Sequence, residues 1–153
     1  MAKKRRIRPI ALCVFRRGDQ ILVYKGFDSA SGVSFCRPLG GGIELGEHSR
    51  DTILREIREE LGAVVTNLVP LGVVESIFMY LGKQRHEIVF VYDGQFEDAS
   101  LYDQEMLSVV EGDDCFEAQW LSLSDFQQGM ERLVPEQLLE VLTSYQGHGS
   151  VWR

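Results

Sequence analysis

The stretch "GGIELGEHSRDTILREIREELGA", residues 41–63, passes from glycine-rich sequence into the hydrophobic period of an α-helix. Its aliphatic residues recur at helical spacing, at Ile53, Leu54, Ile57 and Leu61. That spacing places them on one face of a helix. Gly62 is a residue type that commonly ends helices. Ser49 or His48 would be the N-cap, and serine is the better residue type there. The pattern therefore predicts a helix over residues 49 to about 61.

Three glutamates of this predicted helix lie at positions i, i+3 and i+4, namely Glu56, Glu59 and Glu60. They share one side of the helix, where each like-charged pair costs roughly 0.2–0.5 kcal/mol when it is exposed. One interpretation is a solvated face held by ion pairs such as Asp51 with Arg55. The other is a carboxylate cluster whose repulsion is relieved by bound cations.

The residues before the helix favour the second interpretation. Gly40, Gly41 and Gly42 allow close approach of the backbone, and Glu44 and Glu47 follow them. Five carboxylates in one small region would repel one another without cations, and hard oxygen ligands in this number suit Mg²⁺ or Mn²⁺. Because Mg²⁺ commonly joins a few carboxylates to substrate phosphates, we expect metal-dependent phosphoryl or pyrophosphoryl chemistry.

The flanking sequence is typical of β-strands. Apolar runs predict strands within residues 7–27 (two strands around a turn at Gly18-Asp19), 33–39, 68–82, 86–96 and 115–123. The pair 68–82 and 86–96 is most simply an antiparallel hairpin with its turn at Gly82–Arg85. Residues 40–48 and 97–114 are expected to be loops, the second long and acidic, and residues 135–145 a terminal helix opened by Pro135.

This order of elements defines the expected fold. Strands, then a helix, then further strands and a last helix predict an α/β protein. We expect a mixed β-sheet with helices on both faces, in a single domain over residues 1–153.

Composition narrows the function classes. The 153 residues carry a formal net charge of −7, and 44% are hydrophobic, so a basic face for nucleic-acid polymers is not expected. The exception is the run from Lys3 to Arg8, either a solvated arm or a contact for phosphates. No apolar run approaches ~20 residues, and no signal peptide is evident. Three dispersed cysteines indicate reduced thiols in a cytoplasmic protein. Without a long apolar run, no membrane partner is expected.

The spacing within residues 41–63 resembles the Nudix box. Gly41, five residues, Glu47, seven residues and then "REIREELGA" meet every specified position of that signature, with Ala63 a small choice for its last aliphatic position. The resemblance implies the α/β/α sandwich of Nudix proteins. It also implies hydrolysis of a nucleoside diphosphate linked to another group, by water attack on a phosphorus.

Residue roles follow from the resemblance position by position. The implied metal site comprises Gly41, Glu47, Glu56, Glu59 and Glu60. Arg55 resembles the arginine that orients a glutamate of the helix through a bidentate pair. The ion is expected to be Mg²⁺, with Mn²⁺ possible. One glutamate near the metals would serve as base, and which one differs among Nudix proteins.

Some Nudix proteins take a base or an extra ligand from a late loop. Here the acidic segment offers Glu97, Asp98, Asp103, Glu105 and Glu111. Glu105 is the favoured residue, so the expected catalytic set is Glu59, Arg55 and Glu105. A solvated loop without a catalytic role is the alternative.

Substrate binding is expected from residues near the box. Arg37 is a candidate for phosphate, and Phe35 and Tyr80 are candidates for stacking on a base. Phe27, Arg85 and His86 are further candidates, with a core or surface role as the alternative for each. The substrate would be a nucleotide sugar, a dinucleoside polyphosphate or a nucleoside triphosphate. Two classes stay open, a pyrophosphohydrolase or a nucleotide-binding regulatory Nudix domain without turnover, each as a monomer or homodimer.

Overall fold

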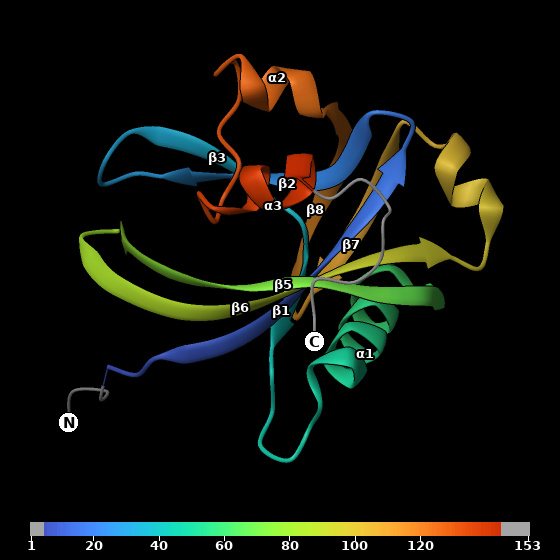
Figure 1. The fold of residues 1–153 in the computed structure, drawn as a ribbon, viewed down its shortest axis with the longest axis horizontal. Coiled ribbons are helices and arrows are strands. Elements are labelled where there is room, and N and C mark those ends of the chain that lie inside the picture. Colours follow the sequence, from blue (N-terminus) through green and yellow to red (C-terminus); the bar gives the residue numbers. More distant parts are fainter. Residues whose placement is uncertain (1–4, 145–153) are drawn as a thin grey trace.

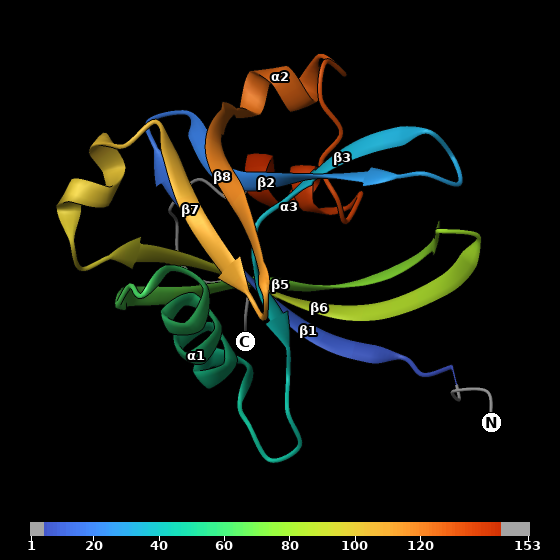
Figure 2. The same ribbon diagram turned by 180° about the vertical axis from the view of Figure 1, so that it is seen from behind.

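The computed structural model describes residues 5–144. The strands are β1 (Arg8–Arg17), β2 (Gln20–Asp28), β3 (Val33–Arg37), β4 (Leu39–Gly42), β5 (Val65–Tyr80), β6 (Lys83–Phe96), β7 (Met106–Glu111) and β8 (Asp114–Ser122). The helices are α1 (Ser49–Leu61), the 3₁₀ helix η1 (Ala99–Asp103), α2 (Leu123–Gln127) and α3 (Leu138–Ser144). Figures 1 and 2 show α1 on one side of the strands and α2 with α3 on the other.

The sheet is mixed and is organised around β1. Its strand order is β5-β6-β1-β2-β8-β7, with β3 added beside β2 and β4 beside β1. The β1–β6 pair is parallel, and the other pairs are antiparallel. Because β1 pairs with β2, β4 and β6, it joins the two halves of the sheet.

Alternate residues of β1 feed two separate cores. Ala11, Cys13 and Phe15 belong to a cluster that includes Ile53 and Ile57 of α1. Their neighbours Ile10, Leu12 and Val14 belong to a second cluster, with Phe126 of α2 and Leu138 and Leu142 of α3. A strand that points successive side chains to opposite faces is buried on both sides only when each face is covered. The expected α/β fold, with helices on both faces of a mixed sheet, is confirmed.

Helix α1 has the bounds that its sequence predicts. Its buried aliphatic face includes Ile53 and Ile57, and Gly62 ends it in the left-handed region with φ of 65°. The preference for Ser49 as N-cap is wrong. His48 occupies that position without a side-chain bond, while Ser49 is the first helical residue and its hydroxyl lies 2.6 Å from the hydroxyl of Tyr92. The hydroxyl of Ser49 therefore pairs with Tyr92, which is distant in the sequence, instead of capping the helix.

Two segments expected to be loops contain strands. Part of the 40–48 loop is β4, which pairs with β1; a Cβ on Gly40 would lie 2.0 Å from the carbonyl oxygen of Ala11, so glycine permits this approach. The acidic 97–114 segment contains η1 and β7, which pairs with β8. Leu107 and Val109 of β7 are buried, a short alternation that the surrounding acidic residues obscure.

The long hairpin and the terminal helix also differ in detail from expectation. The hairpin of β5 and β6 is confirmed, but its turn is the two-residue pair Leu81-Gly82, both with positive φ, a geometry that suits tight hairpins. Helix α3 begins at Leu138 rather than Pro135, and Tyr145 lies outside the described residues. No helix between residues 5 and 144 has the length and apolar character needed to cross a membrane.

Removing the buried side chain of Ile57 should destabilise the fold. Ile57 is fully buried between α1 and β1, and Ile→Ala changes at such sites cost ~2–5 kcal/mol. Urea unfolding of Ile57→Ala should show this loss. Ile7→Ala is the control because Ile7 is 57% exposed and should change stability by ~0.5 kcal/mol or less. Equal effects of the two changes would contradict the assigned core.

Candidate active site

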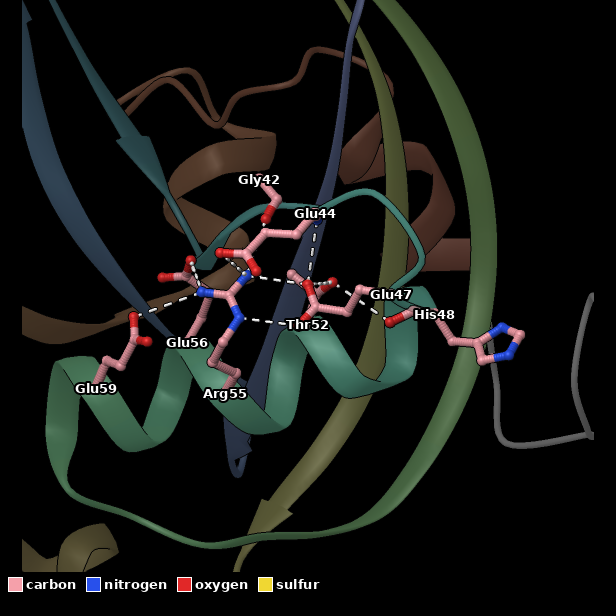
Figure 3. Close-up of polar contacts among 8 residues, drawn as sticks. All are labelled: Gly42, Glu44, Glu47, His48, Thr52, Arg55, Glu56 and Glu59. Carbon is pink, nitrogen blue, oxygen red and sulfur yellow. Dashed lines mark hydrogen bonds and ion pairs between the residues drawn. The ribbon is translucent and has the colours of Figure 1, made fainter.

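Arg55 holds the loop that precedes α1 against the helix. Its Nε donates to Glu47 Oε2 at 2.9 Å and one Nη donates to Glu47 Oε1 at 3.0 Å, a bidentate pair. The same guanidinium donates to Glu56 Oε1 at 2.9 Å and to the carbonyl of Gly42 at 3.1 Å. Oε2 of Glu59 lies 3.5 Å from Nη1 of the same guanidinium. Figure 3 shows these groups converging on Arg55 while the ring of His48 points away.

Glu47 serves mainly as the partner of Arg55 in this arrangement. Its Oε1 also accepts from the hydroxyl of Thr52 at 2.7 Å, so both of its oxygens are bonded. The hydrogen bonds from Arg55 and Thr52 lower the pKa of Glu47 to about 2. The expected bidentate pair of Arg55 is therefore made with a loop glutamate, and the helical Glu56 receives a single hydrogen bond.

A small acidic cavity lies beside this network. It has a volume of about 190 Å³. Its lining includes three glutamates, Glu56, Glu60 and Glu111, and the glycines Gly40 to Gly42. Glu60 is only 6% exposed, and its Oε1 is buried with no hydrogen-bond partner among residues 5–144. Burial, reinforced by the charges of Glu56 and Glu111, raises the pKa of Glu60 to about 8.

Gly41 is required where it faces Glu56. A Cβ at this position would lie 2.4 Å from Cδ and 2.5 Å from Oε1 of Glu56. The carboxylate therefore occupies the space that any side chain at position 41 would fill. The structure brings together Gly41, Glu56 and Glu60 of the predicted metal set, with Glu59 beside Arg55 at 59% side-chain exposure.

The residues around the acidic cavity fit a hard divalent cation. No three acidic, histidine or cysteine side chains of residues 5–144 are already gathered as a complete ligand set. Mg²⁺, however, retains several waters and needs only one or two carboxylates besides substrate phosphates. The unpartnered oxygen of Glu60 and the carboxylate of Glu56, which packs against Gly41, are suitable donors.

The structure does not bring Glu105 to this cavity. Its side chain is 89% exposed and lies 3.9 Å from Arg17. Glu111, at the end of β7, lines the cavity instead. Sequence reasoning included Glu111 among five acidic candidates but had no basis for choosing it, because the strand pairing that positions it was not predicted.

A second, larger cavity continues from the first. It has a volume of about 390 Å³ and shares Arg8, Tyr24 and Arg37 with the acidic cavity. All three residues expected to bind substrate, Arg37, Phe35 and Tyr80, line it. The rings of Phe35 and Tyr80 meet edge to face, with centroids 5.9 Å apart. Arg8 ends the basic N-terminal run, whose Lys3 and Lys4 lie outside the described residues.

Comparison with known proteins establishes the protein family. The model of the NUDIX domain matches residues 4–142, and the chain belongs to the Nudix family. This agrees with the full box from Gly41 to Ala63 and with the fold.

Curated relatives are similar over part of their length. The NAD-capped RNA hydrolase NudC of Pseudomonas aeruginosa is 28% identical over 122 residues, which cover 77% of this chain and 37% of that protein. The protein of the same name from Pseudomonas putida is 27% identical over 124 residues, covering 78% and 38%. The chain thus corresponds to less than two fifths of these relatives.

Solved structures support the fold. A Nudix hydrolase from Nitrosomonas europaea has a TM-score of 0.62 at 18% identity, covering 91% of this chain and 90% of that one. A UDP-X diphosphatase has a TM-score of 0.63 at 20% identity, covering 97% and 68%. At such identities the likeness concerns the fold alone.

Titration of Glu60 should make stability fall as the pH rises in metal-free solution. Its pKa is raised from 4.5 to about 8 in the folded state, so between these values the folded chain binds more protons than the unfolded chain and loses stability with pH. Glu60→Gln removes this loss. We compare the free energies of unfolding of Glu60→Gln and wild type in EDTA. The variant should gain on the order of a few kcal/mol relative to wild type between pH 5 and pH 8.5.

The matched control is Glu117→Gln, because Glu117 is exposed on β8. Urea unfolding at both pH values should show no comparable change for it. If the difference between Glu60→Gln and wild type were independent of pH, the buried, proton-binding state of Glu60 would be wrong.

Proposed function

We propose that this protein is a Mg²⁺-dependent pyrophosphohydrolase. It cleaves a nucleoside diphosphate linked to another moiety by water attack on phosphorus. The observation that supports this is the continuity of the two cavities through Arg8 and Arg37. A diphosphate at this junction would have carboxylates on one side, and room for the attached group on the other.

The metal set that we propose has Glu56, Glu59 and Glu60 as carboxylate ligands, with the backbone at Gly41 beside them. When bound, the divalent ion would polarise the phosphate oxygens and lower the pKa of a coordinated water. Glu47 stays a predicted ligand, although both of its oxygens are hydrogen-bonded here. We propose Arg55 as a positioning residue because it acts through Glu47 and Glu56. The raised pKa of Glu60, about 8, favours its protonated form near neutral pH, and a bound cation would favour loss of that proton.

Arg37 and Arg8 neutralise the substrate side of the site. Neither the net charge of −7 nor the acidic cavity attracts an anion. Two guanidinium groups at the junction offset that repulsion and offer fixed donors to phosphate oxygens. For the late carboxylate that assists water, the geometry favours Glu111 over Glu105, because only Glu111 lines the cavity.

The relatives guide the choice of substrates to test. NAD-capped RNA and UDP-linked compounds appear in the names of similar proteins. We propose a nucleotide derivative of this general kind, in which the nucleoside diphosphate is the common part. A test should therefore include NAD, nucleotide sugars, dinucleoside polyphosphates, nucleoside triphosphates and an NAD-capped RNA oligonucleotide.

Hydrolysis by wild type and Glu59→Gln tests the proposed function directly. With Mg²⁺, wild type should release a nucleoside monophosphate or phosphate from part of the panel, and EDTA should abolish release. Glu59→Gln should lower kcat by about 100-fold or more, since it removes a charge that acts on the metal. Glu105→Gln, the matched control, should retain activity. Binding without turnover by wild type would favour the regulatory alternative instead.

Gly41→Ala should weaken metal binding with little effect on the fold. The new Cβ would displace only the end of the Glu56 side chain, so the free energy of unfolding in EDTA should change by about 1 kcal/mol or less. Affinity for Mn²⁺, measured by calorimetry, should fall about tenfold or more. Gly42→Ala is the control, since a Cβ there would meet only Arg8, at 3.7 Å. Equal Mn²⁺ affinities for both variants would remove Gly41 and Glu56 from the site.

A further inference from the structure

The larger cavity lies between two hairpins that project in the same direction, β2–β3 and β5–β6 (Figures 1 and 2). Residues that face each other across an antiparallel pair share one side of the sheet. On one wall the facing pairs are Tyr24 with Arg37 and Gly26 with Phe35; on the other they are Ser76 with Glu87 and Phe78 with Arg85. The cavity therefore has an inner row of side chains and an outer row.

The two rows are separated by two residues along each strand. At about 3.3 Å per residue, the outer row lies roughly 6–7 Å beyond the inner row. The inner row contains Arg37, at the junction with the acidic cavity. The outer row contains Phe35 and Arg85. It lies farther from that junction by a distance comparable to the length of a nucleoside.

The outer row is built to receive a planar ring. Phe35 lies directly over the backbone of Gly26, where a Cβ would approach its ring to 2.3 Å. Tyr80 meets Phe35 edge to face, and the guanidinium of Arg85 lies 5.9 Å from the centre of the Tyr80 ring. Aromatic and guanidinium groups together favour stacking of a nucleobase.

The carboxylates of this cavity are already engaged. Glu87 pairs with Arg8 at 3.9 Å, and Glu136 pairs with Arg132 at 3.2 Å. Asp28 accepts hydrogen bonds from the backbone of Ala30 and of Leu81 and from the hydroxyl of Ser31.

Arg85 is not engaged in this way. Its Nε is buried, and nothing within residues 5–144 accepts a hydrogen bond from it. A guanidinium group carries donors only. The outer row thus has a hydrogen-bond donor without an acceptor beside an aromatic surface. The carboxylates around it already have hydrogen-bond or ion-pair partners.

We infer that the outer row binds the nucleoside part of the substrate and that Arg85 selects nucleosides presenting two adjacent hydrogen-bond acceptors. This inference rests on the proposed function. Two sources supply that chemistry: the O6 and N7 atoms of a 6-oxopurine, which Arg recognises with a bidentate pair, or a phosphate monoester on the ribose. Adenine presents a donor at N6 next to N7, so an adenosine without an extra phosphate is the disfavoured ligand.

Equilibrium binding of nucleotide products tests this without turnover. Calorimetry in Mg²⁺ buffer compares AMP with GMP, adenosine 2′,5′-bisphosphate and adenosine 3′,5′-bisphosphate. GMP or a bisphosphate should bind wild type about 10–100-fold more tightly than AMP, the range expected for hydrogen bonds to a charged group. Arg85→Gln should abolish that preference, because it should weaken the binding of GMP or the bisphosphate about 10–100-fold more than the binding of AMP.

Further variants separate the contributions. Arg85→Lys keeps the charge but loses the planar fork, so it should retain only part of the preference. Phe35→Leu should weaken all four ligands alike, by about tenfold, because it removes stacking alone. Arg50→Gln, a change at an exposed residue of α1, should behave as wild type. A thermal melt of each variant confirms that the chain is folded.

The outcomes are distinct. A preference for GMP assigns the acceptors to the base, and a preference for a bisphosphate assigns them to the ribose phosphate; either supports the inference if Arg85→Gln removes it. Equal affinities for all four ligands in wild type, or a preference that survives Arg85→Gln, would overturn it. Absence of hydrolysis with an Arg85-dependent preference intact would instead contradict only the proposed function.

Discussion

The convergence of several carboxylates on Arg55 is the interaction on which the site depends. One guanidinium bonds Glu47 through two hydrogen bonds, Glu56 through one and the carbonyl of Gly42 through another. It therefore ties the glycine-rich loop to α1 and offsets the repulsion that closely spaced acids would otherwise suffer. Its planar fork suits this geometry, which the point charge of a lysine would not reproduce.

Two glutamates of α1 line the acidic cavity, and of these two Arg55 bonds Glu56. Glu60 is buried in α1 with an unpartnered oxygen, and Glu56 lies against the bare backbone of Gly41. Such an arrangement is costly without a cation, since an ionised carboxylate loses its hydration on burial. In the function that we propose, binding of a divalent ion offsets this cost.

The sheet places the larger cavity beside this acidic centre. β1 is covered by α1 on one face and by α2 and α3 on the other, and it pairs with β4, whose glycines line the acidic cavity. The backbone of Cys36 in β3 exchanges hydrogen bonds with Arg132 and Val134, which adds a third wall to the cavity between the hairpins. In the function that we propose, Arg8 and Arg37 at the junction of the two cavities offset the net charge of −7 for an anionic substrate.

Local sequence determined α1, its end at Gly62 and the grouping of Glu56, Glu59 and Glu60. The reason is that helical spacing and the 23-residue signature can both be read within one contiguous stretch of the chain. It also indicated Phe35, Arg37 and Tyr80, all of which line one cavity. It was wrong about residues 97–114, since pairing with β8, rather than composition, makes β7 a strand.

Tertiary structure alone decided that Glu111, rather than Glu105, faces the acidic cavity and that Arg85 stands opposite Phe35. The reason is physical: these residues lie some 50 positions from their neighbours in the site, and only sheet register, which no local pattern encodes, brings them together.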